Sequence, residues 1–110
     1  MNNTVEYKGY VGTVEFLENE NIFYGTVQGI RSLIQYQGDT ANEFIEDFHA
    51  AVDQYLEICT SEGTAPEIPY KGSYNIRIKP ELHKRLAIRA INENISLNQA
   101  TENAIIAYLA

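Results

Sequence analysis

A lone strand pattern in the last third of the chain most limits what the chain can fold into. Apolar and polar residues alternate over 73–79, and two amphipathic helical patterns follow, over 80–94 and 96–110. No second strand pattern lies nearby. A strand without a neighbour leaves backbone N–H and C=O groups unpaired, and such groups tend to recruit another chain. We therefore expect this strand to pair with its copy in a homodimer. The predicted dimer core is formed by its apolar face, Tyr74, Ile76 and Ile78.

An antiparallel sheet is predicted before this segment. Alternation over 7–16 indicates one strand, and residues 22–27 and 32–37 indicate two more, with polar or glycine-containing turns between them. Residues 1–6 show little pattern and are expected to form a frayed lead-in. The expected arrangement is a meander of three strands.

A long helix is predicted to follow the sheet and to cover one of its faces. Thr40 and Glu43 have the spacing of a capping box, and Gly63 is a natural helix stop. His49 and Cys59 are interpreted as packing residues, because they border or lie on the apolar side of the helix. That apolar stripe comprises Ala41, Phe44, Ile45, Phe48, Val52, Tyr55, Leu56 and Cys59.

Charge is divided unevenly along the chain. Residues 1–63 contain two basic and eleven acidic side chains, a net charge of −9, whereas residues 72–110 have a net charge of +2. Between them, residues 64–71 are neutral and contain two prolines, which is typical of a stiff linker. We interpret this as an acidic domain over 1–63, a linker over 64–71 and a second module over 72–110. The acidic domain should repel DNA and attract a basic partner.

Cellular location is inferred from cysteine content and hydropathy. The single cysteine, Cys59, cannot form an internal disulfide and suits a reducing cytoplasm. No apolar stretch is long enough to span a membrane, and no signal-peptide pattern is visible. The sequence thus predicts a cytoplasmic protein with no membrane partner.

The last module resembles a ribbon-helix-helix DNA-binding module of the Arc/MetJ type. The resemblance is carried by the alternating strand, the Pro80-Glu81-Leu82 helix start and the Ser96-Leu97-Asn98 start of the next helix. In that family, strands paired across a dimer lie in the major groove. The resemblance implies base reading by Ser73, Asn75 and Arg77, since Asn suits adenine and Arg suits guanine. It also implies phosphate binding by Lys79, Ser96, Leu97 and Asn98.

The chain as a whole resembles a HicB-type antitoxin. The N-terminal matches are Tyr-Lys-Gly-Tyr-Val-Gly over 7–12, the strand pair over 25–38 and the helix over 40–63. The resemblance implies an α+β fold: a small antiparallel sheet with one covering helix, partial RNase H-like, and then the ribbon-helix-helix module. It also implies that residues 1–63 bind a small basic HicA-like toxin, an mRNA interferase. The dimer, or a tetramer built from it, would repress its own operon by binding operator DNA.

Other functions have less support in the sequence. A stand-alone dimeric repressor without a toxin partner remains the alternative. An RNA-processing nuclease would follow only from fold analogy. No nucleophile, base and orienting group can be assembled from these residues, and the spacing of Glu43, Glu46, Asp47 and Asp53 is that of a solvated helix face. We therefore expect a non-enzyme with no metal site and no cofactor.

Overall fold

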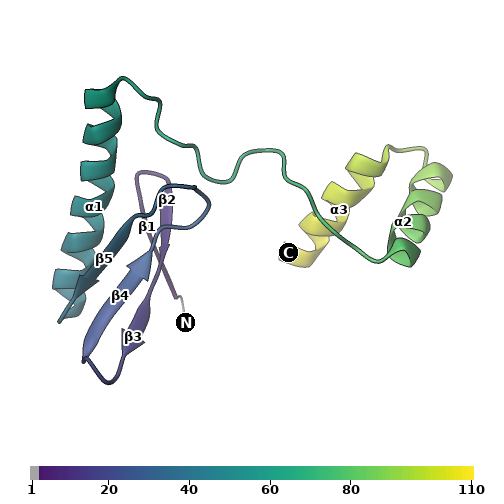
Figure 1. Cartoon of the computed structure of the whole chain (residues 1–110). Coiled ribbons are helices and arrows are strands. Elements are labelled where there is room, and N and C mark those ends of the chain that lie inside the picture. The colour runs from purple at the N-terminus through teal and green to yellow at the C-terminus, as the bar shows by residue number, and fades with distance from the viewer. Residues whose placement is uncertain (1–2) are drawn as a thin grey trace. The chain divides into compact units, whose positions relative to one another are not determined.

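The computed structural model of the chain describes residues 3–110 and has an α+β architecture. The chain divides into two compact units, Met1–Gly72 (unit 1) and Ser73–Ala110 (unit 2). Five short strands and one long helix lie in unit 1, and two shorter helices lie in unit 2 (Figure 1). The predicted α+β class is confirmed at this level. In the described part of the chain, no helix is both long and apolar enough to cross a membrane.

The strands of unit 1 form two antiparallel sheets that share one register. An isolated bridge between Gly12 and Val27 continues the register of the second sheet into the first. β2 and β3 are therefore two segments of one strand, interrupted at Val14, and the strands follow one another in the order β1, β2/β3, β4, β5. Their bounds are β1 (Thr4–Tyr7), β2 (Tyr10–Thr13), β3 (Glu15–Leu17), β4 (Ile22–Thr26) and β5 (Gln35–Gly38).

Side chains replace ladder hydrogen bonds at the interruption. The Thr13 hydroxyl accepts a bond from the main-chain N–H of Thr26 at 3.0 Å. From the helix side of the sheet, the Tyr36 hydroxyl donates to the Thr13 carbonyl oxygen at 2.9 Å. Glycines make room for the Tyr36 ring: a Cβ at Gly12 would overlap its hydroxyl, and a Cβ at Gly25 would overlap the Thr13 carbonyl. Burial raises the pKa of Tyr36 to about 12.

The single strand predicted over 7–16 is wrong in its extent. Lys8 and Gly9 both have positive φ, 52° and 83°, and form a two-residue turn that separates β1 from β2. Turns of this hand match the twist of the strands that they join, so glycine here favours a hairpin. The meander of β3, β4 and β5 confirms the predicted antiparallel order.

Two further boundaries differ from prediction. β1 begins at Thr4, so a frayed lead-in over 1–6 is wrong for residues 4–6, and residues 1 and 2 lie outside the described part. The strand predicted over 32–37 begins only at Gln35. The Asn3 carbonyl accepts from the N–H of Val14, which ties the start of the chain to the sheet. Bends at residues 29–32 return the chain along β4, and the Ile34 carbonyl accepts from the N–H of Val27 just before β5 begins.

The helix α1 (Ala41–Glu62) covers one face of the sheet (Figure 1). The Thr40 hydroxyl accepts from the N–H of Glu43 at 3.1 Å, and Gly63 ends the helix with φ of 70°. The Glu43 carboxylate accepts from Asp39 rather than from Thr40, so the predicted capping box is displaced by one residue. Each large core side chain contributes about 1.5–3 kcal/mol by burial. The buried core comprises Tyr10, Val27, Ile34, Tyr36, Phe44, Phe48 and Val52.

The predicted packing roles of two α1 residues are confirmed. Cys59 is buried, and the ring of His49 stacks on that of Tyr7 with centroids 4.0 Å apart. Two residues of the predicted stripe depart from the rest, since Ala41 is exposed and Ile45 stays 37% exposed.

Unit 2 contains α2 (Pro80–Asn92) and α3 (Leu97–Leu109), which pack against each other. Pro80 occupies the first turn of α2, as predicted. The Ser96 hydroxyl caps α3 by accepting from the N–H of Gln99 at 3.0 Å. The Gln99 side chain bonds Asn103 and does not reach back to the Ser96 N–H, so only the hydroxyl half of a capping box forms at this helix start.

Candidate functional site

Residues 73–79 form no strand with any partner inside the described chain. Lys79 has φ of −64° and ψ of 138°, so the segment enters α2 in extended geometry. The predicted pairing needs a second copy and stays a prediction. All seven residues are exposed, including the predicted dimer-core residues Tyr74, Ile76 and Ile78.

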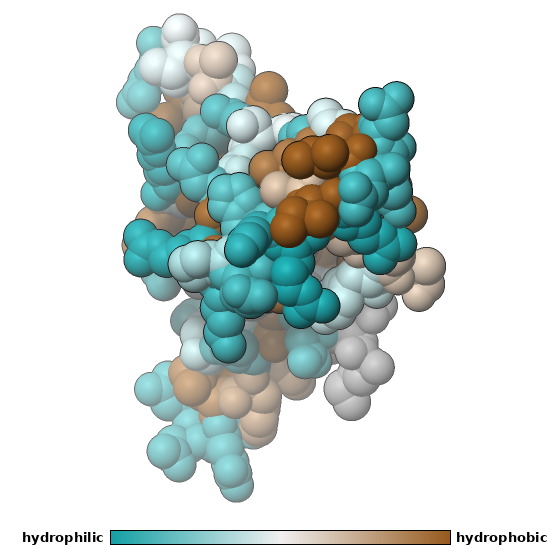
Figure 2. Space-filling view, turned by 90° about the vertical axis from the view of Figure 1, so that its right-hand side faces the viewer, coloured by the Kyte–Doolittle hydropathy of each residue, from teal (hydrophilic) through white to brown (hydrophobic). Residues whose placement is uncertain are grey.

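Unit 2 buries very little of its apolar surface. Within it, only Ala90 and Ala100 are buried. Apolar side chains appear at the molecular surface as a brown patch in Figure 2. Modules below about 40 residues rarely fold without a partner, a metal or a disulfide, and such exposure marks an interaction surface. The large apolar side chains exposed in this unit include Tyr74, Ile76, Ile78, Leu82, Ile88, Ile91, Ile105, Ile106, Tyr108 and Leu109.

The three predicted base-reading residues lie on one short extended segment. Ser73, Asn75 and Arg77 are all exposed, and none forms a side-chain hydrogen bond or ion pair with another described residue. Because successive side chains of an extended segment point to opposite sides, these three share one side and the apolar residues share the other. Their side chains are thus available to a partner.

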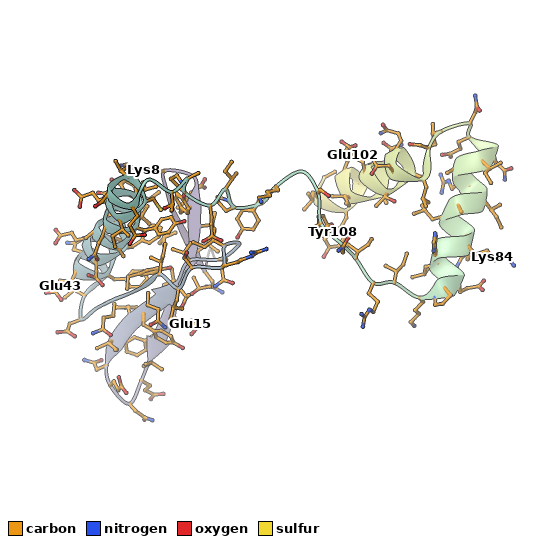
Figure 3. All side chains as sticks on the ribbon, turned by 45° about the horizontal axis from the view of Figure 1, so that its top comes forward. Lys8, Glu15, Glu43, Lys84, Glu102 and Tyr108 are labelled. Carbon is orange, nitrogen blue, oxygen red and sulfur yellow. The ribbon has the colours of Figure 1, made fainter. Side chains whose placement is uncertain are left out.

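The predicted phosphate-binding residues lie at the two helix starts of unit 2. Lys79 is the N-cap of α2, and Ser96 is the N-cap of α3, followed by Leu97 and Asn98 in its first turn. First-turn N–H groups and the helix dipole favour an anion there. Lys84, on α2, projects from the outer surface of unit 2 (Figure 3) and is exposed, as expected of a solvated helix face.

Unit 1 presents an acidic helix. α1 carries six carboxylates and no Lys or Arg, and Glu43 is exposed on its surface (Figure 3). Asp53 is the one in an ion pair, with Lys8 Nζ 2.8 Å from its Oδ1. Hydrogen bonding to Lys8 lowers the pKa of Asp53, and the Tyr7 hydroxyl also donates to it at 3.1 Å. The other five have no cationic partner among the described residues.

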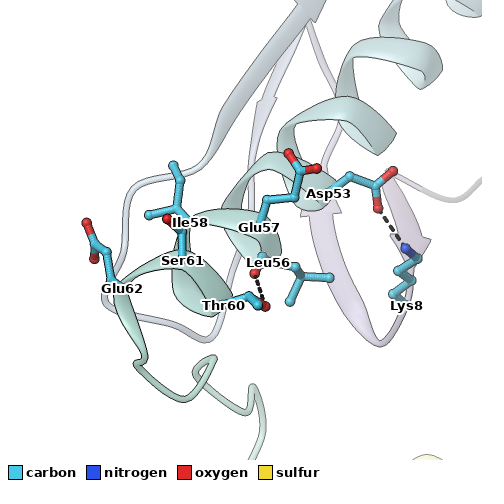
Figure 4. Close-up of a pocket in the computed structure, with 8 residues that line it drawn as sticks. All are labelled: Lys8, Asp53, Leu56, Glu57, Ile58, Thr60, Ser61 and Glu62. Carbon is cyan, nitrogen blue, oxygen red and sulfur yellow. Dashed lines mark hydrogen bonds and ion pairs between the residues drawn. The ribbon is translucent and has the colours of Figure 1, made fainter.

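A shallow hollow of about 900 Å³ borders the second half of α1 (Figure 4). Exposed Ile58 lies among acidic side chains there, and the Lys8–Asp53 pair closes one side. The hollow holds no assembled nucleophile and base. It is lined by Lys8, Asp53, Leu56, Glu57, Ile58, Thr60, Ser61 and Glu62.

Glu67 joins the segment after α1 to the rest of unit 1, a role that the sequence did not reveal. Its carboxylate accepts from Arg31 N–H at 2.8 Å and from Ser32 N–H and hydroxyl at 3.0 and 2.6 Å. The Glu67 N–H donates to the Tyr55 hydroxyl, and its carbonyl accepts from Tyr10. The bonds to its carboxylate, with the Ser32 hydroxyl as the largest cause, lower the pKa of Glu67 to about 2. The only sequence feature that could have pointed to Glu67 is its position between two prolines.

No group of three or more His, Cys, Asp or Glu side chains in residues 3–110 is placed to hold a metal ion. The acidic residues of α1 follow helical spacing along a solvated face, as their sequence pattern predicts.

Comparison with known proteins finds one relationship. Residues 55–105 match the HicB family, a range that runs from the second half of α1 into α3. No curated protein and no solved structure shows significant similarity to the chain. The match supports a HicB-type protein and suggests the antitoxin role of a toxin–antitoxin pair. Antitoxins of that family are generally non-enzymatic.

Proposed function

We propose that this protein is the antitoxin of a type II toxin–antitoxin system, which neutralises a HicA-like mRNA interferase and represses its own operon. The observation that carries the proposal is the HicB match over residues 55–105. It includes part of α1 in unit 1 and almost all of unit 2, so it draws on both the acidic and the basic part of the chain.

Toxin binding is assigned to unit 1. A protein that binds RNA phosphates must present basic side chains, and α1 offers six carboxylates of which only Asp53 is paired with a cation. Opposite potentials across an interface speed encounter and exclude wrong partners. Unit 1 would mask the toxin by occupying the surface that RNA would otherwise contact.

Operator binding is assigned to a homodimer of unit 2. Pairing of two 73–79 strands would satisfy their backbone groups and cover Tyr74, Ile76 and Ile78. The opposite side of this ribbon would then place Ser73, Asn75 and Arg77 of both copies in the major groove. Lys79 and the start of α3 would contact phosphates.

Co-expression tests the proposal. A short basic HicA-like protein, sought in the reading frames next to this one, is produced together with the tagged full-length chain, and the complex is isolated by pull-down. We expect a stable complex that blocks RNA cleavage by the basic protein. If no complex forms while the chain still binds its promoter DNA, the protein is a stand-alone repressor.

A further inference from the structure

We propose that the basic partner of unit 1 adds a β-strand to the free edge of β5, with alternate side chains basic and apolar. The proposal rests on the proposed function and names the surface by which that function would be carried out. Strand addition provides affinity through main-chain bonds and specificity through pockets for alternate side chains.

The backbone of β5 has unused bonding groups at this edge. In an antiparallel pair, facing residues alternate between exchanging two hydrogen bonds and exchanging none. The N–H of Gln37 bonds the Asp47 carboxylate at 2.8 Å, so it points away from its partner Tyr24. By the same alternation Gln35, two residues earlier, directs its N–H and C=O to the free edge. A strand of a second protein can therefore register against Gln35 and Gln37.

The Asp47 carboxylate restricts which strands can pair with this edge. A bare edge strand invites aggregation, and natural proteins commonly protect edges with charge. The Asp47 carboxylate, held on α1, covers the Gln37 N–H and opposes an incoming carbonyl oxygen by repulsion. A Lys or Arg side chain on an added strand can form an ion pair with Asp47, which frees the Gln37 N–H to bond the added backbone. An uncharged strand cannot do this. Asp47 thus makes the β5 edge selective for a basic strand.

Two hollows flank the edge, one on each side of the sheet. The hollow on the α1 side has a volume of about 470 Å³, and its charged lining is entirely acidic: Asp39, Glu43, Glu46 and Asp47. The hollow on the opposite side has a volume of about 270 Å³ and a mixed lining, in which Leu17, Ile22 and Tyr24 lie beside the carboxylate of Glu20. Gln37 and Asp47 line both. Side chains of an added strand would enter the two hollows alternately, which sets the expected alternation of basic and apolar residues.

The edge that β1 forms beside β2 is a poorer acceptor for the same strand. Val14 bonds the Asn3 carbonyl, so by alternation the backbone groups of Thr4 also point outward. At the turn between β1 and β2, however, Lys8 already pairs with a carboxylate of α1, Asp53. A second copy of this chain is excluded as the β5 occupant, because two acidic α1 surfaces would repel each other.

The test uses the full-length chain and the short basic protein sought for the co-expression experiment. Gln35→Pro removes an outward N–H and leaves the β4–β5 ladder intact, since proline is tolerated at such edge positions. Thr4→Pro is the matched control on β1. We expect Gln35→Pro to weaken the complex by more than about tenfold and Thr4→Pro to leave it unchanged. Circular dichroism and urea midpoints establish that both variants fold.

Hydrogen exchange on the wild-type chain gives a second measurement that needs no variant. Complex formation should slow exchange at the amides of Gln35 and Gln37 and leave that of Thr4 unchanged. A complex that forms equally well with Gln35→Pro, and with no slowing in β5, overturns strand addition while the antitoxin role stands.

A peptide probe separates the two proposals further. The blocked hexapeptide Lys-Val-Arg-Val-Lys-Val should slow exchange in β5, and Glu-Val-Glu-Val-Glu-Val should not. If the basic peptide slows exchange in β5 but the basic protein forms no complex with the chain, the antitoxin role is wrong and the proposal of strand addition at β5 is supported. If neither binds, both proposals are wrong.

Discussion

The hydroxyl group of Tyr36 lies 2.9 Å from the main-chain carbonyl oxygen of Thr13 and donates a hydrogen bond to it. This bond joins β5 to the interrupted strand β2/β3 across β4, beneath Gly12 and Gly25. It satisfies a carbonyl at the place where the ladder is broken. It thereby adds a side-chain bond to the β4–β5 ladder that positions β5 and the proposed docking edge.

Tyr36→Phe should destabilise unit 1 by about 1–3 kcal/mol, because it leaves the buried Thr13 carbonyl without a donor and changes little else. Urea unfolding followed by near-UV circular dichroism measures the change. Tyr24→Phe, on the other side of the sheet, is the matched control and should shift stability by less than about 0.5 kcal/mol. If the two variants lower the free energy of unfolding equally, the Tyr36–Thr13 hydrogen bond contributes nothing specific to stability.

Gly25→Ala should prevent unit 1 from reaching its native state, since the added Cβ would overlap the main-chain oxygen of Thr13. Backbone cannot move aside as a flexible side chain can, so we expect a loss of more than about 2 kcal/mol. Gly72→Ala, where a Cβ meets nothing within 4 Å, is the control and should be close to neutral. A Gly25→Ala chain with a wild-type melting curve would contradict the packing described here.

Glu67→Gln should change how stability depends on pH. The folded-state pKa of Glu67 is about 2, below the ordinary value of 4.5, so its bonds stabilise the fold above pH 4.5. That contribution is lost as the pH falls from about 4.5 to about 2. The variant should unfold at lower urea than wild type at pH 7, and the two curves should converge near pH 2. Glu62→Gln, at the exposed end of α1, serves as control; a constant gap between Glu67→Gln and wild type across this range would argue against the proposed linkage.

Ile76→Glu should abolish the homodimer of unit 2, because it places a charge in the proposed strand–strand interface. Sedimentation velocity on the full-length chain distinguishes monomer from dimer. Lys84→Glu, on the solvated face of α2, is the control for added acidity. A dimer that survives Ile76→Glu would place the interface elsewhere.

Asn75→Ala and Arg77→Ala should each cost about 1–3 kcal/mol of operator binding and relax sequence preference at one base pair. Gel-shift titration with promoter DNA and with scrambled DNA measures both effects. Lys84→Ala should weaken binding to promoter DNA and to scrambled DNA by the same small amount. Unchanged affinity in both strand variants would show that this segment does not read bases.

Local chemistry explains what the sequence predicts well here. Thr40, Gly63, Pro80 and Ser96 act within one helical turn, so their effects can be recognised without knowing the fold. The apolar stripe of α1 is equally local. Helix bounds and the meander order were therefore predictable.

Long-range contacts account for what was missed. The interruption of β2/β3 depends on Tyr36, which is 23 residues from Thr13, and Glu67 is 35 residues from its partner Ser32. No pattern within a short window reports such pairs. The Lys8-Gly9 turn was overlooked because alternation continues through it in register, so residues 7–16 appear as one strand.

The charge of α1 also separates two aspects of partner binding. With no Lys or Arg along 22 residues, the helix projects a field that reaches a basic molecule before contact. That field governs how often productive encounters occur and fades at high ionic strength, because salt screens it within about a Debye length. Backbone bonds at β5 form only after docking and are much less sensitive to salt, so they would govern residence time. A partner could thus be captured quickly by one element and retained by another.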